Sequence, residues 1–240
     1  MQLPNIRATI IPDPGHIFVE IDLKMADAHV VAWEADDVHL KAMFRAGIDV
    51  YTETSSGIWS DPRLPLSRQI RKNCVHSVNY GAGYRTLAER YTGTEASAKH
   101  FINTWFDHHP GIREWHRRIQ WDLQQSLTPT IHNIWGYRRV YACPTPLTQP
   151  LAWIGQSTVA RVNKQILLAF DQHGLQVMMP HHDSVLLQIP EADAPGCFAA
   201  LLALARVTIP YDDPLIIPSD LKWSPRSWGH MEPWINEQPI

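Results

Sequence analysis

Two cations and two rings follow one another at steps of four between residues 68 and 80. Arg68, Lys72, His76 and Tyr80 would share one face of a helix, because positions four apart drift only slowly around the axis. Arginine grips phosphate with two hydrogen bonds, lysine acts as a point charge, and a ring can lie against a base. A solvated helix face is the alternative for the cation pair. The two rings and the break at Gly81 favour a helix that binds a polyphosphate and a base.

Two aspartates are predicted where strands end. Residues 17–22 read as a short buried strand that finishes on Asp22. Residues 175–190 read as two apolar strands bent around the run from His181 to Ser184, which contains His182 and Asp183. A carboxylate at a strand end presents a hard oxygen ligand that suits Mg²⁺. A helix N-cap is the alternative for Asp22, and a packed or capping histidine is the alternative for His182.

Composition sets limits on the class of protein. The chain has 240 residues, 45% of them hydrophobic, which is enough for one large domain or two small ones. A net charge of -3 argues against an autonomous nucleic-acid binder, which needs excess Lys and Arg. Three widely spaced cysteines make neither a zinc site nor a disulfide framework. With no signal peptide or long apolar run, we expect a soluble, cytoplasmic protein that does not interact with membranes.

Hydrophobic periodicity indicates the remaining elements. Helical patterns cover residues 85–91, 95–106, 111–126 and 151–173, and strand-like content covers residues 132–144. Strands and helices along one chain indicate a mixed α/β (α+β) fold class.

The helix at 68–80 resembles motif B of family A DNA polymerases, R-x3-K-x3-[aromatic]-x3-YG. The segment DLKMADAHVVA is similar to motif A, D-Y-S-Q-I-E-L-R-V-L-A, with Asp22 on the first Asp and Asp27 on the Glu. His182 and Asp183 fall on the second and third positions of motif C, V-H-D-E. Tyr51 stands where the family's D-I-H-T-E-T segment carries His, and simple packing is the alternative for this ring.

The resemblance implies a polymerase palm, with an antiparallel sheet and an α-helical fingers insertion. The expected division is residues 1–47 as the N-terminal part of the palm, 48–130 as the fingers, and 131–240 as the C-terminal part of the palm.

The resemblance also implies template-directed DNA synthesis from dNTPs on a primer 3′-OH, by the palm and fingers part of a split or truncated polymerase. Asp22 and Asp183 would bind two Mg²⁺ ions, with Mn²⁺ as a substitute, and would be catalytic. Arg68 and Lys72 would hold the triphosphate, and Lys72 would also protonate the leaving pyrophosphate.

Further roles follow by position within the family's motifs. His76 would stack near the incoming base, Tyr80 would guard the template position, and Asp27 would select the sugar. The residues implied to contact primer–template DNA are Gln156, His182, Arg138 and Arg139.

Four residues depart from the family pattern. Ser184 replaces the motif C Glu, Asp27 replaces a Glu, His76 replaces Phe or Tyr, and His29 replaces Arg. Ser184 and Asp27 leave open the alternative that the enzyme is a polymerase that accepts ribonucleotides. The Ala28–Ala32 run, in contrast, follows the DNA-polymerase pattern. A polymerase-like, non-catalytic subunit that binds nucleic acid is the alternative from another class.

The family's thumb has no counterpart in this sequence. We therefore expect a second, more basic chain to supply a thumb or other DNA-binding surface, in a bacterium or a phage-infected cell.

Overall fold

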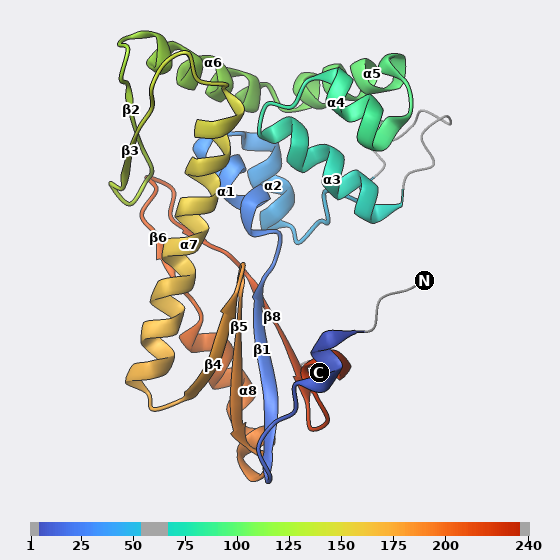
Figure 1. Ribbon diagram of the computed structural model, residues 1–240, viewed down its shortest axis with the longest axis vertical. Coiled ribbons are helices and arrows are strands. Elements are labelled where there is room, and N and C mark those ends of the chain that lie inside the picture. Colours follow the sequence, from blue (N-terminus) through green and yellow to red (C-terminus); the bar gives the residue numbers. More distant parts are fainter. Residues whose placement is uncertain (1–4, 54–66, 236–240) are drawn as a thin grey trace. The chain divides into compact units, whose positions relative to one another are not determined.

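A computed structural model describes residues 5–53 and 67–235 of the chain. The chain forms two compact units. The first combines residues 1–26 with 159–240, and the second comprises residues 27–158. Helices and an antiparallel sheet make up the fold, which confirms the predicted α+β class (Figure 1).

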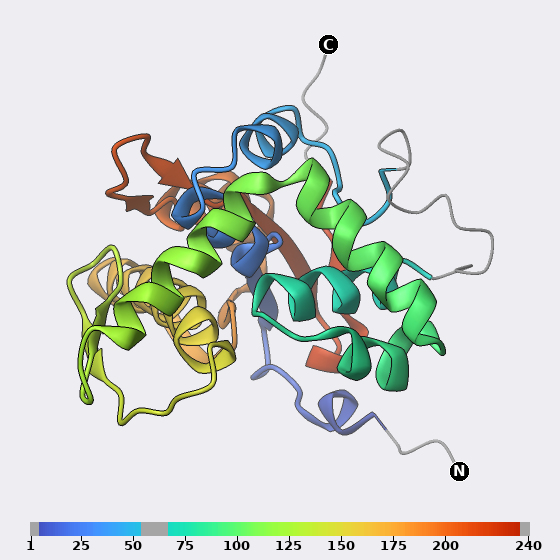
Figure 2. The same ribbon diagram turned by 90° about the horizontal axis from the view of Figure 1, so that it is seen from above.

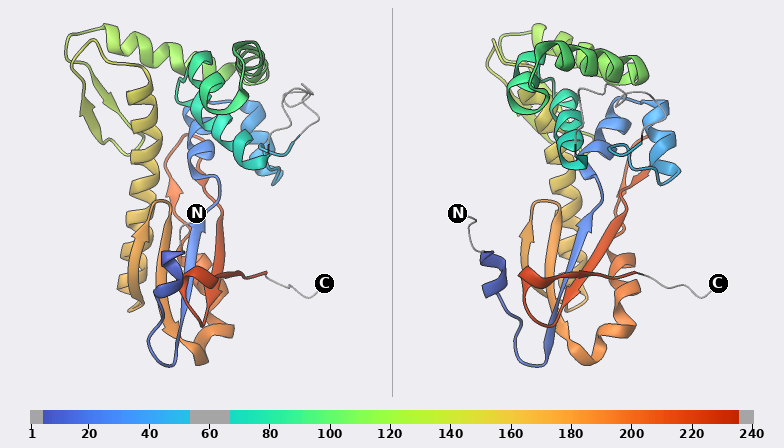
Figure 3. Two further views of the ribbon diagram at one scale, coloured as in Figure 1. Left: turned by 45° about the vertical axis from the view of Figure 1, so that its right-hand side comes forward. Right: turned by 90° about the vertical axis from the view of Figure 1, so that its right-hand side faces the viewer.

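The first unit is built on an antiparallel sheet in which strand β1 is central (Figure 3). The strand order is β4-β5-β1-β8-β9. The strands are β1 (His16–Leu23), β4 (Gln176–His181), β5 (Ser184–Pro190), β8 (Ser219–Ser224) and β9 (Glu232–Pro233).

The central position of β1 explains its sequence. A strand reads as a nearly continuous apolar run when both of its faces are covered, and residues 17–21 are all buried. In the register, Asp22 lies opposite Ser184 on β5 and opposite Asp220 on β8. Both neighbouring strands therefore present side chains on the same face beside Asp22.

Helices and short turns complete the first unit. The C-terminal half of α7 (Thr148–Gln172) belongs to it and buries Val162, Ile166 and Phe170 at four-residue steps. The other elements are η1 (Ile6–Thr9), η3 (Glu191–Asp193), α8 (Ala194–Leu204), β6 (Thr208–Ile209), β7 (Leu215–Ile216) and η4 (Trp228–His230).

The second unit is mainly helical. Figure 2 shows α5 and α6, which follow one another with only His109 between them. Its elements are α1 (Ala26–Glu34, which begins at the unit boundary), α2 (Val38–Arg45), α3 (Arg68–Asn79), α4 (Tyr84–Leu87), a π turn (Ala88–Thr92), α5 (Glu95–His108), α6 (Pro110–Gln124), β2 (Thr130–His132), β3 (Arg138–Val140) and the first part of α7.

The core of the second unit anchors the C-terminal end of α3. Trp105 on α5 is fully buried, and its Nε1 donates to Asn79 Oδ1 at 3.0 Å. The Nε2 of buried His116 on α6 lies 2.8 Å from the Asn79 carbonyl oxygen. Two helices thus fix the last turn of α3, where Tyr80 is the C-cap.

The predicted elements correspond closely to those observed. The strand at 17–22, the hairpin at 175–190 and the helices at 95–106, 111–126 and 151–173 are confirmed. The helix expected at 85–91 is divided into α4 and the π turn. The division into palm and fingers at residues 47 and 130 stays a prediction, since compactness alone does not define those subdomains.

Among the helices of the described residues, none combines the length and the apolar character that crossing a bilayer requires.

Candidate active site

Asp22 and Asp183 lie at the same end of the sheet in the first unit. Asp22 is near the C-terminal end of β1, and Asp183 is in the turn between β4 and β5. The backbone N–H of Leu23 donates to the Asp183 carbonyl at 3.0 Å. Antiparallel pairing of β1 with β5 therefore brings the two predicted metal-binding carboxylates together.

The turn that carries Asp183 is held by three features. His182 has a positive φ of 54°, a left-handed conformation that closes the two-residue connection. The buried side chain of Asn163 on α7 donates from Nδ2 to the His182 carbonyl at 2.9 Å. The Ser184 hydroxyl lies 3.0 Å from the His181 carbonyl. These bonds leave the Asp183 carboxylate available for a ligand.

The electrostatics around Asp22 favour a bound cation. Burial raises the pKa of Asp22, the negative charges of Asp183 and Glu20 raise it further, and Lys222 lowers it. The Lys222 Nζ lies 3.6 Å from Asp22 Oδ2. A divalent ion would relieve the repulsion between the two aspartates, and their hard oxygens suit Mg²⁺.

The protein offers an open site rather than a closed metal cage. Within residues 5–53 and 67–235, no three His, Cys, Asp or Glu side chains are arranged to hold a metal. Mg²⁺ commonly takes one or two carboxylates and fills its other positions with water and substrate phosphates. The pair of aspartates fits that coordination pattern.

Helix α3 carries the predicted phosphate-binding residues of the second unit. Ser67 caps the helix by accepting from Ile70 N, which sets the start of the four-residue series at Arg68. Arg68 Nε lies 2.7 Å from Asp49 Oδ2, and its guanidinium stands 5.4 Å from the centre of the Tyr51 ring. Lys72 is exposed, and no ion pair joins it to a carboxylate of a described residue.

The rings of α3 converge on Asp27. The Tyr80 hydroxyl donates to Asp27 Oδ1 at 2.7 Å, and His76 Nδ1 lies 3.8 Å from Asp27 Oδ2. The His76 and Tyr80 rings meet edge to face at 4.6 Å. Burial, followed by the charge of Asp27, raises the pKa of Tyr80 far above its ordinary value, so the phenol stays a hydrogen-bond donor.

Two further departures from the family pattern are packing residues in this structure. Tyr51 is 2% exposed and lines a narrow hollow with Asp27, His76 and Tyr80. Burial raises the pKa of Tyr51, so the ring is a neutral wall of the hollow. His29 is also buried and stacks on Phe44, with ring centres 3.9 Å apart.

The predicted primer–template residues are all exposed, as contact with DNA requires. Arg138 and Arg139 lie on β3, in a hairpin that Asn133 ties to α7 through a 2.8 Å hydrogen bond to Ser157 Oγ. These residues and Gln156 belong to the second unit, whereas His182 belongs to the first. Their roles toward DNA stay predictions.

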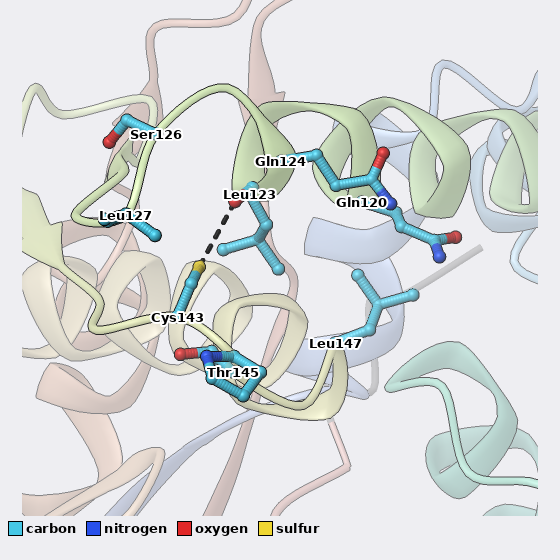
Figure 4. A pocket seen from close by; sticks show the side chains of 9 residues that line it. Gln120, Leu123, Gln124, Ser126, Leu127, Cys143, Thr145 and Leu147 are labelled. Atoms are coloured by element: carbon cyan, nitrogen blue, oxygen red, sulfur yellow. Dashed lines mark hydrogen bonds between the residues drawn. The ribbon is translucent and has the colours of Figure 1, made fainter.

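The second unit contains a hollow larger than the one beside Tyr51, but its lining lacks groups for binding metal or phosphate. It measures about 660 Å³ and lies between the end of α6 and the loop before α7 (Figure 4). Its lining is mostly apolar and amide, and its Cys143 thiol donates to the Leu123 carbonyl. The hollow therefore offers neither a metal ligand set nor a charged group for phosphate.

Gly155 makes room for the Tyr80 side chain. A Cβ at position 155 would lie 2.4 Å from the Tyr80 hydroxyl oxygen and 3.2 Å from the ring. Gly155→Ala should destabilise the chain by about 1–3 kcal/mol through overpacking, offset in part by about 1 kcal/mol of helix propensity. Urea unfolding measures the difference. Tyr80→Phe removes the clashing oxygen, so Gly155→Ala should cost less in that background; equal costs in both backgrounds would contradict the close-approach argument.

Sequence reasoning missed four residues that contact predicted site residues or the turn that carries one: Glu20 and Asn163 in the first unit, and Asp49 and Gly155 in the second. Glu20 lies two residues before Asp22 on a strand, so period-two alternation could have placed both on one face. Asp49 contacts Arg68, which follows 19 positions later in the chain, and Gly155 lies against Tyr80, 75 positions earlier. Sequence spacing carries no signal of such distant pairs.

Comparison with known proteins places the chain in a family. The profile for DNA polymerase family A matches residues 2–145, more than half of the chain, and the chain belongs to this family. Family A DNA polymerases generally use divalent metal ions.

The relatives are longer proteins. DNA polymerase I, thermostable, from Thermus aquaticus is 23% identical over 235 residues, which cover 91% of this chain and 27% of the relative. DNA polymerase I from Chloroflexus aurantiacus is 26% identical over 259 residues, covering 95% of this chain and 26% of the relative. The chain thus spans roughly a quarter of each.

A solved structure shares the fold. The POL domain of Pol1 from M. smegmatis, in complex with DNA primer-template and dNTP, has a TM-score of 0.74 to this chain. The match covers 93% of this chain and 42% of that one, at 20% sequence identity.

Proposed function

We propose that this chain catalyses DNA-directed DNA synthesis, transferring a nucleotide from a dNTP to a primer 3′-OH. The observation that carries the proposal is the convergence of Asp22 and Asp183 at one end of an antiparallel sheet. Membership of family A and the cations of α3 support it. The relatives' names and the primer-template and dNTP in the similar structure point to the same reaction.

Asp22 and Asp183 would hold two Mg²⁺ ions, for which Mn²⁺ would substitute. Such ions activate the attacking hydroxyl and neutralise charge on the leaving oxygens. The chain's own contribution begins with the two carboxylates, which are already positioned by β1 and the β4–β5 turn. Arg68 and Lys72 would bind the triphosphate, and Lys72 would donate a proton to the pyrophosphate oxygen as it leaves.

The other predicted residues complete the proposal. Asp27 would select the sugar, Tyr80 would guard the template position, and His76 would stack near the incoming base. Residues 1–47 and 131–240 would act as the palm and residues 48–130 as the fingers. The residues proposed to contact the primer and template are Gln156, His182, Arg138 and Arg139.

Further basic surface is needed to grip a DNA duplex. The chain carries a net charge of -3, whereas affinity for DNA depends on neutralising phosphates with Lys and Arg. We propose that a second, more basic chain supplies this surface, as a thumb does. Mixing candidate partners with the chain should increase the length of extension products in proportion to their binding.

A second candidate function is a polymerase that accepts ribonucleotides, and it differs from the first in the choice of sugar. Asp27 is one methylene shorter than the Glu of the family, and Ser184 replaces the motif C Glu, which favours acceptance of ribonucleotides. Asp27→Glu should raise the preference for dNTP over NTP by about tenfold, as a single methylene does in other pockets. The ratio of the two kcat/KM values measures this. Asp171→Glu, an exposed change on α7, should leave the ratio unmoved.

The experiment that tests the proposed function is primer extension by the purified chain. Separate reactions contain dNTPs or NTPs with Mg²⁺, and Asp183→Ala is the control variant. Extension that the variant lacks would establish the polymerase activity. If neither the wild-type chain nor the Asp183→Ala variant extended the primer, with or without a basic partner, the result would favour the alternative of a non-catalytic subunit that binds nucleic acid.

A further inference from the structure

Glu20 faces the same side of the sheet as the proposed metal-binding pair. It lies two positions before Asp22 on β1, and side chains two apart on a strand point to one face. Ser184 lies directly opposite Asp22 in the register. Glu20 Oε1 accepts a hydrogen bond from Trp228 Nε1 at 3.1 Å. It also lies 3.2 Å from Ser184 Oγ, whose single hydroxyl proton it shares with the His181 carbonyl at 3.0 Å.

The Glu20 carboxylate is buried without a cation beside it. Its side chain is 6% exposed, and no ion pair joins it to a Lys, Arg or His of the described residues. Lys222 pairs with Glu20 in the strand register, yet its Nζ is directed to Asp22. An uncompensated buried charge costs several kcal/mol, and neutral hydrogen bonds recover only part of it. Packing alone does not account for an acid at this position.

A carboxylate at position 20 can replace a negative charge that motif C of this chain lacks. Ser184 occupies the position at which the family pattern V-H-D-E has Glu, so β5 brings no second carboxylate to the site. Ser184 instead hydrogen-bonds to a carboxylate that β1 brings. We propose that Glu20 is the accessory carboxylate of this site: from β1 it supplies the negative charge that Ser184 lacks and so strengthens divalent-cation binding by Asp22 and Asp183.

This inference rests on the proposed function, and it assigns Glu20 a positioning role. The carboxylate acts through its charge and through the Ser184 hydroxyl, since the described residues contain no cluster of three acids close enough to share a metal.

The test is Mn²⁺ binding to the chain, measured from the electron paramagnetic resonance signal of free Mn²⁺. Glu20→Gln keeps an Oε1 acceptor for Ser184 and Trp228 but removes the charge. It should raise the dissociation constant for Mn²⁺ at least about fivefold, with an unfolding midpoint in urea at or above that of the wild type, since the buried charge is removed. Glu20→Asp keeps the charge and should stay within about twofold of the wild type.

The outcomes separate this inference from the proposed function. If Asp183→Asn weakened Mn²⁺ binding but Glu20→Gln left it unaltered, the role of Glu20 would be refuted while the proposed function would stand. If the wild-type chain had no Mn²⁺ site, or one that did not depend on Asp183, both the role of Glu20 and the proposed function would be refuted. Weakened binding in Glu20→Gln and near-normal binding in Glu20→Asp would support the inference, because a purely structural role does not distinguish the two variants by charge.

Discussion

Replacing Asp183 by alanine is expected to lower the rate of primer extension by about 10³-fold or more while the chain stays folded. Metal ions contribute several kcal/mol to transition-state stabilisation, and each 1.36 kcal/mol is about tenfold in rate. The turn itself should survive, because it is held through the carbonyls of His182 and Asp183 and not through the carboxylate. Single-turnover extension at saturating dNTP is the measurement.

Matched variants distinguish loss of the metal ligand from loss of structure. Asp183→Asn keeps the shape and removes the charge, so its defect should approach that of alanine. Asp171→Ala removes an exposed carboxylate on α7 and should leave extension unchanged. Asp22→Ala should behave like Asp183→Ala, since one site needs both carboxylates. Activity retained in either alanine variant would refute the assignment of the pair.

Local patterns predicted the elements that bear the proposed catalytic residues. The apolar run at 17–21 implied a buried strand, and the four-residue step from Arg68 implied the face of a helix. Both are properties of neighbouring residues, which is why they can be read along the chain. The placement of Asp183 beside Leu23 required strand pairing, and only the resemblance to motifs A and C anticipated it.

Contacts between distant segments could not be predicted in this way. The hydrogen bond from Ser184 to Glu20 spans 164 positions, and it depends on the register of β1 with β5. A shift of one residue would turn Glu20 to the other face. Tyr51 shows the same limit: the sequence around it does not predict whether the ring is buried, and its burial follows from the helices that surround it.

Arg68 and Lys72 are expected to differ in importance despite their similar predicted roles. Arg68 already has Asp49 as a partner at 2.7 Å, which competes with a phosphate for the guanidinium. The exposed ion pair adds little to stability, because such pairs contribute about 0–1 kcal/mol. Lys72 has no acidic partner within residues 5–53 and 67–235, so its ammonium is available to a triphosphate.

Lys72→Ala should therefore lower kcat/KM for dNTP by about 10²-fold or more, the usual cost of removing one preorganised charge or general acid. Lys72→Arg separates the two proposed roles, since arginine keeps the charge but does not give up a proton at neutral pH. It should restore KM for dNTP without restoring kcat. Lys99→Ala, which removes an exposed lysine on α5, is the control. If Lys72→Arg restored both constants, Lys72 would bind phosphate without acting as an acid, and if Lys72→Ala changed neither, α3 would not contact the triphosphate through this residue.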